Sequence, residues 1–103
     1  MQSDLLFETL ADPTRRRLMS LLLRGERSAG DLVEATTMSQ PAVSKHLKVL
    51  RDSGFAKVRI DGQRRLYSLR PEPLAELDRW LAPFRIFWSQ KLDSLERYLD
   101  EEA

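Results

Sequence analysis

The sequence predicts a mainly α-helical protein with one small β-hairpin, an α+β arrangement in a single domain over residues 1–103. Apolar residues recur at steps of three and four near both ends of the chain, the spacing of amphipathic helices. Between them, residues 55–70 alternate in polarity around Asp61-Gly62, a strong tight-turn signal. A composition of 42% hydrophobic and 32% charged residues is typical of a soluble globular protein.

Two helices are predicted before residue 25. The first covers residues 3–10. The second starts at Asp12-Pro13, because aspartate is a favoured N-cap and proline fits the first helical position. It ends near Leu23, and Gly25 follows at the position where glycine commonly terminates a helix.

A short helix and a longer helix follow, separated by a turn of three residues. Ser28 is the expected cap of the short helix, Ala29–Ala35, and Ser39 is the expected cap of the long one, Ser39–Arg51. This order, with the more basic helix second, is that of a helix-turn-helix. A plain helical hairpin in a bundle is the alternative.

The helix Ser39–Arg51 has a packed back and a polar, basic front. Val43, Leu47 and Leu50 form one narrow apolar stripe. The polar and basic side chains outside this stripe suit the major groove of DNA. Among them, Gln40 and Ser44 are the better candidates for contacts with base edges. His46 lies on a flank, from which it either packs beside the stripe or contacts DNA, and we favour DNA. The full set of candidate DNA contacts on this helix is Ser39, Gln40, Ser44, Lys45, His46 and Lys48.

The predicted hairpin follows the second helix directly, and Arg59, Arg64 and Arg65 lie near its tip. A helix-turn-helix followed by a basic hairpin is a winged helix. We expect the hairpin arginines to reach phosphates or the adjacent minor groove.

The last segment, residues 73–100, is helical in pattern but contains Pro83, which should kink or split it. Its aromatic and leucine residues exceed what a small domain needs to cover its own core, so we expect a subunit interface. The alternative is a ligand pocket lined by Trp80, Phe84, Phe87 and Trp88. The expected interface residues are Leu6, Phe7, Leu81, Phe84, Trp88, Leu92, Leu95 and Leu99.

The net charge of +1 is unevenly distributed along the chain. Residues 1–38 carry a net charge of −1, residues 39–70 of +6, and residues 71–103 of −4. The only basic third therefore contains the helix-turn-helix and the hairpin, as expected for binding to phosphates.

Several classes of function are not expected. The chain has no cysteine, one histidine, no glycine-rich phosphate loop and no recognisable pair of catalytic carboxylates, so we expect no enzyme and no cofactor. No apolar run reaches the length of a membrane span, and the first residues do not resemble a signal peptide. A cytoplasmic location is the expectation.

Three segments resemble the ArsR-type winged-helix transcriptional regulators: LADPTRRRLMSLL at 10–22, SQPAVSKHLKVLRDSG at 39–54 and DGQRRLYSL at 61–69. The resemblance implies a homodimer with the first and last helices at its interface. It also implies that the dimer binds a palindromic operator, most often as a repressor. It also implies DNA contacts from the recognition helix and the wing. The matching positions are Gln40, Ser44, Lys45, His46, Arg64 and Arg65.

The sequence departs from the metal-sensing members of that family. The helix Ala29–Ala35 has no cysteine and the last helix has no histidine, whereas zinc and soft-metal sites need several such ligands. We therefore expect no metal sensing through the family's known sites. The remaining signals to which the regulator could respond are another small molecule, a partner protein and its own concentration. The competing function is a winged-helix module that binds proteins without reading DNA.

Overall fold

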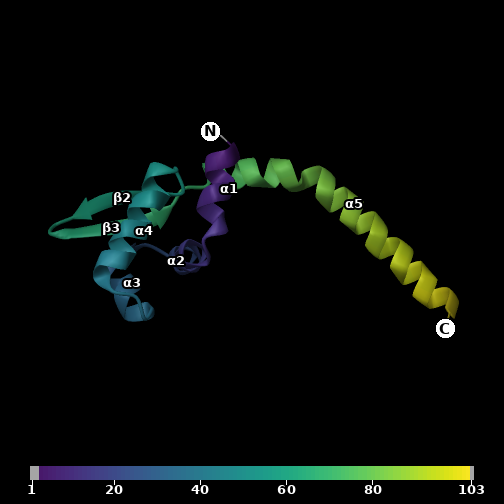
Figure 1. Ribbon diagram of the computed structural model, residues 1–103, viewed down its shortest axis with the longest axis horizontal. Helices are drawn as coiled ribbons and strands as arrows, with labels where there is room; N and C mark the ends of the chain where they lie inside the picture. Colours follow the sequence, from purple (N-terminus) through teal and green to yellow (C-terminus); the bar gives the residue numbers. More distant parts are fainter. Residues whose placement is uncertain (1–2, 103) are drawn as a thin grey trace.

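The computed structural model describes residues 3–102 and confirms the predicted fold class. Figure 1 shows a body of short helices with a hairpin at one end and a long helix projecting from the other. The elements are α1 Ser3–Ala11, α2 Pro13–Leu23, β1 Arg27–Ser28, α3 Ala29–Ala35, α4 Gln40–Asp52, β2 Ala56–Asp61, β3 Arg64–Leu69 and α5 Glu72–Glu102.

The junction between α1 and α2 is held by side chains that satisfy the free backbone groups of both helix ends. The Asp12 carboxylate accepts hydrogen bonds from the backbone N–H groups of Thr14 and Arg15 at 2.8 and 3.2 Å, which caps α2 as predicted. In the other direction, Arg15 donates to the Thr9 carbonyl at 2.8 Å and Arg16 to the Leu10 carbonyl at 2.6 Å. These contacts fix the angle between the two helices.

The core lies between α2, α3, α4 and the start of the hairpin. The predicted stripe of α4, Val43, Leu47 and Leu50, is buried to 1% exposure or less. Leu18 and Leu32 meet it from α2 and α3 at 0% exposure. One face of α4 is therefore anchored in the core, which leaves the opposite face free.

The hairpin β2–β3 pairs in antiparallel register from Ala56 opposite Leu69 to Asp61 opposite Arg64. The turn therefore consists of Gly62 and Gln63, one residue later than the Asp61-Gly62 turn that we predicted. Gly62 has φ +64° while Gln63 has no positive φ, the pattern of a type II′ turn with glycine first.

A third strand, β1, was not predicted. Arg27 pairs with Tyr67 and Ser28 with Leu66, so the sheet has the order β1-β3-β2. A strand of two residues is too short to show an alternating pattern, and only its partner strand defines it.

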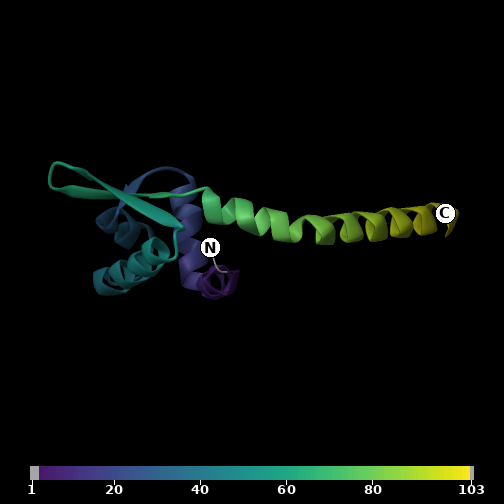
Figure 2. The ribbon, with the colours of Figure 1, turned by 90° about the horizontal axis from the view of Figure 1, so that it is seen from above.

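The last helix, α5, runs through Pro83 without a break, so of the two outcomes that we expected at this proline, a kink or a split, the split is wrong. Figures 1 and 2 show it leaving the body and bending gently rather than stopping. Proline removes one hydrogen bond and bends a helix, which the surrounding turns can tolerate.

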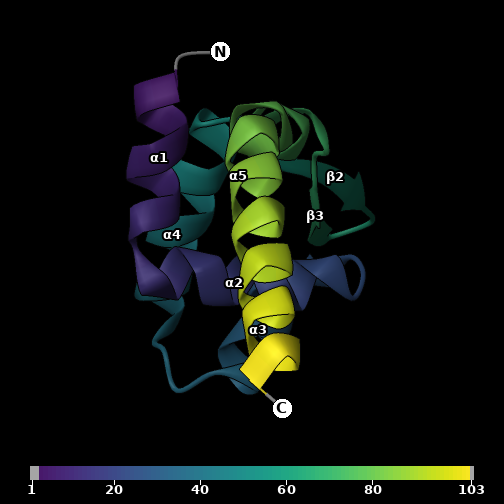
Figure 3. The ribbon, with the colours of Figure 1, turned by 90° about the vertical axis from the view of Figure 1, so that its right-hand side faces the viewer.

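The projecting helix makes the molecule long and thin. Its principal extents are 63, 30 and 21 Å, and its radius of gyration is 18.4 Å. A compact domain of this length has a radius of gyration of about 13 Å. Figure 3 looks along the long axis, with α5 in front of the body and its C-terminal end toward the viewer.

Candidate nucleic-acid interface

The two helices of the helix-turn-helix both start at a serine cap. Ser28 and Asp31 form a reciprocal capping box: Ser28 Oγ accepts from the Asp31 N–H at 3.1 Å, and Asp31 Oδ2 accepts from the Ser28 N–H at 2.9 Å. Ser39 Oγ accepts from the Ala42 N–H at 3.3 Å. The turn between α3 and α4 therefore ends at a defined residue, which sets the start of α4.

The front of α4 is exposed, as predicted. Gln40, Ser44, Lys45 and Lys48 all point away from the core. Lys48 Nζ lies 2.9 Å from the Asp52 carboxylate in an i, i+4 ion pair, so part of its charge is balanced on the helix itself. The face offers amide and hydroxyl groups near the N-terminus and lysines further along.

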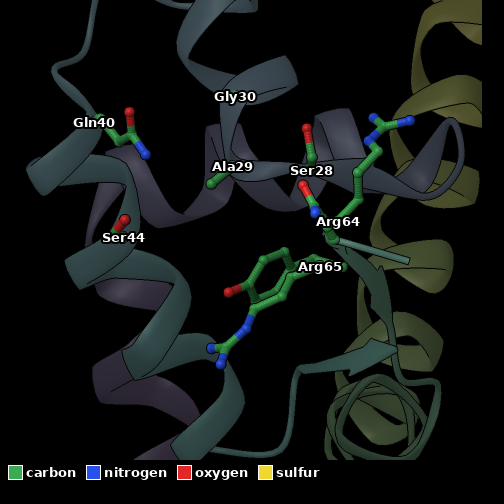
Figure 4. A pocket seen from close by; sticks show the side chains of 9 residues that line it. Ser28, Ala29, Gly30, Gln40, Ser44, Arg64 and Arg65 are labelled. Atoms are coloured by element: carbon green, nitrogen blue, oxygen red, sulfur yellow. The ribbon is translucent and has the colours of Figure 1, made fainter. Parts of the chain in front are cut away.

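A groove of about 410 Å³ separates α4 from the hairpin. Figure 4 shows Gln40 and Ser44 projecting from α4 on one side, with Arg64 and Arg65 of β3 across from them. The structure thus brings the amide and hydroxyl groups of Gln40 and Ser44 into one groove with the Arg64 and Arg65 side chains, although the two pairs are far apart in the sequence. The groove is lined by Ser28, Ala29, Gly30, Gln40, Ser44, Gln63, Arg64, Arg65 and Tyr67.

Two of the three predicted hairpin arginines hold the hairpin against the body. Arg59 makes a bidentate contact with Glu26, with both N···O distances at 2.8 Å. Arg64 Nη2 lies 3.2 Å from Asp31 Oδ2. Arg65 makes no ion pair in the described part of the chain. No local sequence pattern indicates these pairs, because their partners are 33 residues apart.

The two carboxylates in these pairs are stabilised in their charged form. The hydrogen bond from Arg59 lowers the pKa of Glu26 below its ordinary value of 4.5. The hydrogen bond from the Ser28 N–H lowers the pKa of Asp31 below its ordinary value of 3.8.

The lowered pKa values of Glu26 and Asp31 predict how the stability of the folded chain changes in acid. Because both pKa values are lower in the folded chain, the unfolded chain takes up more protons, and the free energy of unfolding decreases as the pH falls through this range. The contribution is complete above the ordinary values and is lost as the pH falls through the lowered ones. Urea unfolding between pH 3 and 6 measures the free energy of unfolding as a function of pH. This free energy should fall less steeply with decreasing pH in Glu26→Gln than in the unchanged chain. An unchanged dependence in that variant would contradict the assignment.

His46 occupies a different environment from the other candidates on α4. Its side chain is half-buried, and its Nδ1 is buried without a hydrogen-bond partner in the described part of the chain. The buried Nδ1 atom favours packing of His46 within the domain over the DNA contact that we expected.

The predicted interface residues differ in how far they are exposed in the single chain. Leu6 is 1% exposed and belongs to the core of its own chain, so its assignment to a subunit interface is wrong. Leu81 is half-buried and Phe7 is partly exposed. The remaining members are between 45% and 62% exposed along α5: Phe84, Trp88, Leu92, Leu95 and Leu99.

The aromatic residues of the alternative ligand pocket lie along the outer surface of α5. Trp80 packs edge-on against Phe7 at 5.1 Å between ring centroids and lies 4.6 Å from the Phe84 ring. Phe87 and Trp88 are 58% and 62% exposed. Together they form a continuous outward-facing surface, which favours the interface over the pocket.

None of the helices in residues 3–102 is both long enough and apolar enough to cross a bilayer. Within the same residues, no three His, Cys, Asp or Glu side chains lie close enough to hold a metal ion.

Comparison with known proteins agrees with this geometry. The sequence profile of the bacterial regulatory protein arsR family matches residues 12–58, which run from the cap of α2 into β2. The HTH-type transcriptional regulator Rv2034 of Mycobacterium tuberculosis is 37% identical over 97% of this chain and 91% of its own length. A crystal structure of an ArsR family transcriptional regulator superposes with a TM-score of 0.72 at 32% identity, covering 84% of this chain and 89% of that one. The chain belongs to the ArsR family.

Other members of the family are named for specific roles. The transcriptional repressor SdpR of Bacillus subtilis is 35% identical over 76% of this chain and 87% of its own length. A probable mercury resistance operon repressor of Streptomyces lividans is 45% identical over 69% of this chain, which spans only 57% of that protein. The shared regions identify this ArsR-family chain as a transcriptional regulator with the winged-helix fold that we predicted.

Proposed function

We propose that this ArsR-family regulator is a homodimeric repressor that acts in the cytoplasm and binds a palindromic operator in double-stranded DNA. The groove between α4 and the hairpin carries the proposal, because it places Gln40 and Ser44 opposite Arg65. An α-helix fits the major groove of B-DNA, and an arginine beside it suits the phosphates that flank that groove. No catalytic or cofactor chemistry is required of the chain.

The contacts divide by chemistry. Gln40 and Ser44 can donate to and accept from base edges, so they read sequence. Ser39, Lys45, Lys48 and Arg65 bind phosphates and set the register of α4. Arg59 acts indirectly, because its bidentate contact with Glu26 fixes the hairpin beside the groove.

Dimerisation supplies the second half of the recognition surface. The apolar face of α5 carries large side chains that are between 45% and 62% exposed, and contiguous exposed apolar surface is typical of protein–protein interfaces. A second copy would cover it with an identical face about a two-fold axis, which places two α4 helices on one operator. The proposed contributors are Phe7, Leu81, Phe84, Trp88, Leu92, Leu95 and Leu99.

Selection of bound fragments from random DNA tests this function. We expect an inverted repeat whose half-site centres are roughly 34–36 Å apart, or a multiple of that spacing. Gln40→Ala should change the selected bases, whereas Gln90→Ala, an exposed substitution on the polar face of α5, should not. Recovery of fragments with no shared sequence would contradict operator recognition.

The exposed face of α5 also favours a second candidate, a module that binds another protein without reading DNA. The same selection separates the two functions. Enrichment of one sequence supports the repressor, and its absence at moderate salt supports the protein-binding module.

A further inference from the structure

We propose that Asp31 weakens DNA binding by holding Arg64 away from the phosphate backbone. The inference rests on the proposed function, since it concerns how strongly the same surface binds DNA. It assigns a restraining role to the Asp31 carboxylate of α3, which pairs with a residue of the groove wall.

The Asp31 carboxylate is fixed in position rather than free to swing away. Its Oδ2 accepts the Ser28 N–H at 2.9 Å as part of the cap of α3, and the same oxygen lies 3.2 Å from Arg64 Nη2. The cap therefore presents a stationary negative charge to the hairpin. Both side chains stay accessible to solvent, at 58% exposure for Arg64 and 39% for Asp31, so a phosphate can compete for the guanidinium.

The three hairpin arginines differ in the charge that faces them. Arg59 is bound by both oxygens of Glu26, and Arg64 is bound by Asp31. Arg65 is the next residue along β3 and makes no ion pair in the described part of the chain. In the free protein, Arg65 is thus the one hairpin arginine whose guanidinium is not already neutralised by a carboxylate.

A phosphate that recruits Arg64 must displace Asp31 or approach its negative charge. Either route reduces the gain from the contact, because like charges at this range repel. The ion pair is exposed, so the restraint is modest and adjusts affinity without abolishing binding.

Asp31→Asn tests the restraint directly. The asparagine carbonyl can still accept the Ser28 N–H, while the charge that holds Arg64 is removed. Binding to a random-sequence duplex should tighten by about two- to tenfold at roughly 0.1 M salt, and the slope of log K against log salt should steepen by about 0.9 per chain, the value of one added phosphate contact. Affinity and slope equal to those of the unchanged chain would overturn the proposal.

Two matched variants separate this role from a general charge effect. Glu34→Gln removes the same charge from the same helix at an exposed position that makes no ion pair within residues 3–102, and it should leave the slope unchanged. Asp31→Asn should have no effect on the slope in an Arg64→Ala background. An equal steepening with Glu34→Gln, or in that background, would overturn the proposal.

A second comparison leaves the Ser28–Asp31 cap unchanged, so it tests the proposal even if the Asp31→Asn variant does not fold. In the otherwise unchanged chain, Arg65→Ala should flatten the slope on the random duplex by about 0.9 per chain, and Arg64→Ala by much less. Equal losses would overturn the restraint. The unchanged chain is first tested for operator selection, so a failure of DNA recognition itself is identified separately.

Discussion

A chain carrying Trp88→Glu and Leu95→Glu is expected to sediment as a monomer at a concentration where we expect the unchanged chain to sediment as the proposed dimer. Both side chains are more than half exposed in the single chain, at 62% and 53%. A glutamate at either position would be buried without a partner in the dimer, at a cost of several kcal/mol per uncompensated charge.

The position of these residues on α5 explains why the effect should be large. The helix has 31 residues and is therefore about 46 Å long. Only its start is covered within the chain, where Trp80 packs on Phe7. Apolar residues then recur at a spacing of 11, which is close to three helical turns and keeps them on one face. The pairs at this spacing are Leu81 with Leu92, Phe84 with Leu95, and Trp88 with Leu99.

Loss of the dimer should also reduce operator affinity by a factor of about 100 or more. One subunit contacts only one half-site, so the gain from binding two linked half-sites is lost. Sedimentation velocity measures the oligomer, and fluorescence anisotropy with the selected operator measures binding.

Ile86→Glu is the matched control for both measurements. Ile86 is 62% exposed, as Trp88 is, but it lies on the opposite side of α5 from the apolar face. This variant should remain a dimer and bind the operator normally. If the variant with Trp88→Glu and Leu95→Glu remained a dimer, or if Ile86→Glu became a monomer, the apolar face of α5 would not be the subunit interface.

Arg65→Ala is expected to weaken operator binding about tenfold at low salt and to reduce the salt slope by about 0.9 per chain. Arg65 lies in the groove wall opposite α4 and makes no ion pair in the described residues, so its full charge is available to a phosphate. Because a phosphate carries no sequence information, the selected sequence should not change.

The control for this variant is Arg97→Ala, which removes an exposed arginine from the far end of α5. It should leave both the affinity and the salt slope unchanged. A slope that is insensitive to Arg65→Ala would remove the hairpin from the set of DNA contacts.

The sequence by itself determined the features that depend on neighbouring residues. The caps at Asp12, Ser28 and Ser39 lie where they were predicted, because a cap is a contact across two or three residues. The apolar stripe of α4 was predictable for the same reason, since helical period alone sets which face is buried. These local signals were sufficient to define the helix-turn-helix and the hairpin.

Only the tertiary structure decided how the hairpin is held and which of its arginines are free. Glu26 and Asp31 reach Arg59 and Arg64 across 33 residues, and no local pattern reports such a pair. Long-range packing also placed Leu6 in the core and buried the Nδ1 atom of His46. The net charge of the basic third was evident from the sequence, but its availability to DNA depends on which carboxylates the fold places beside each arginine.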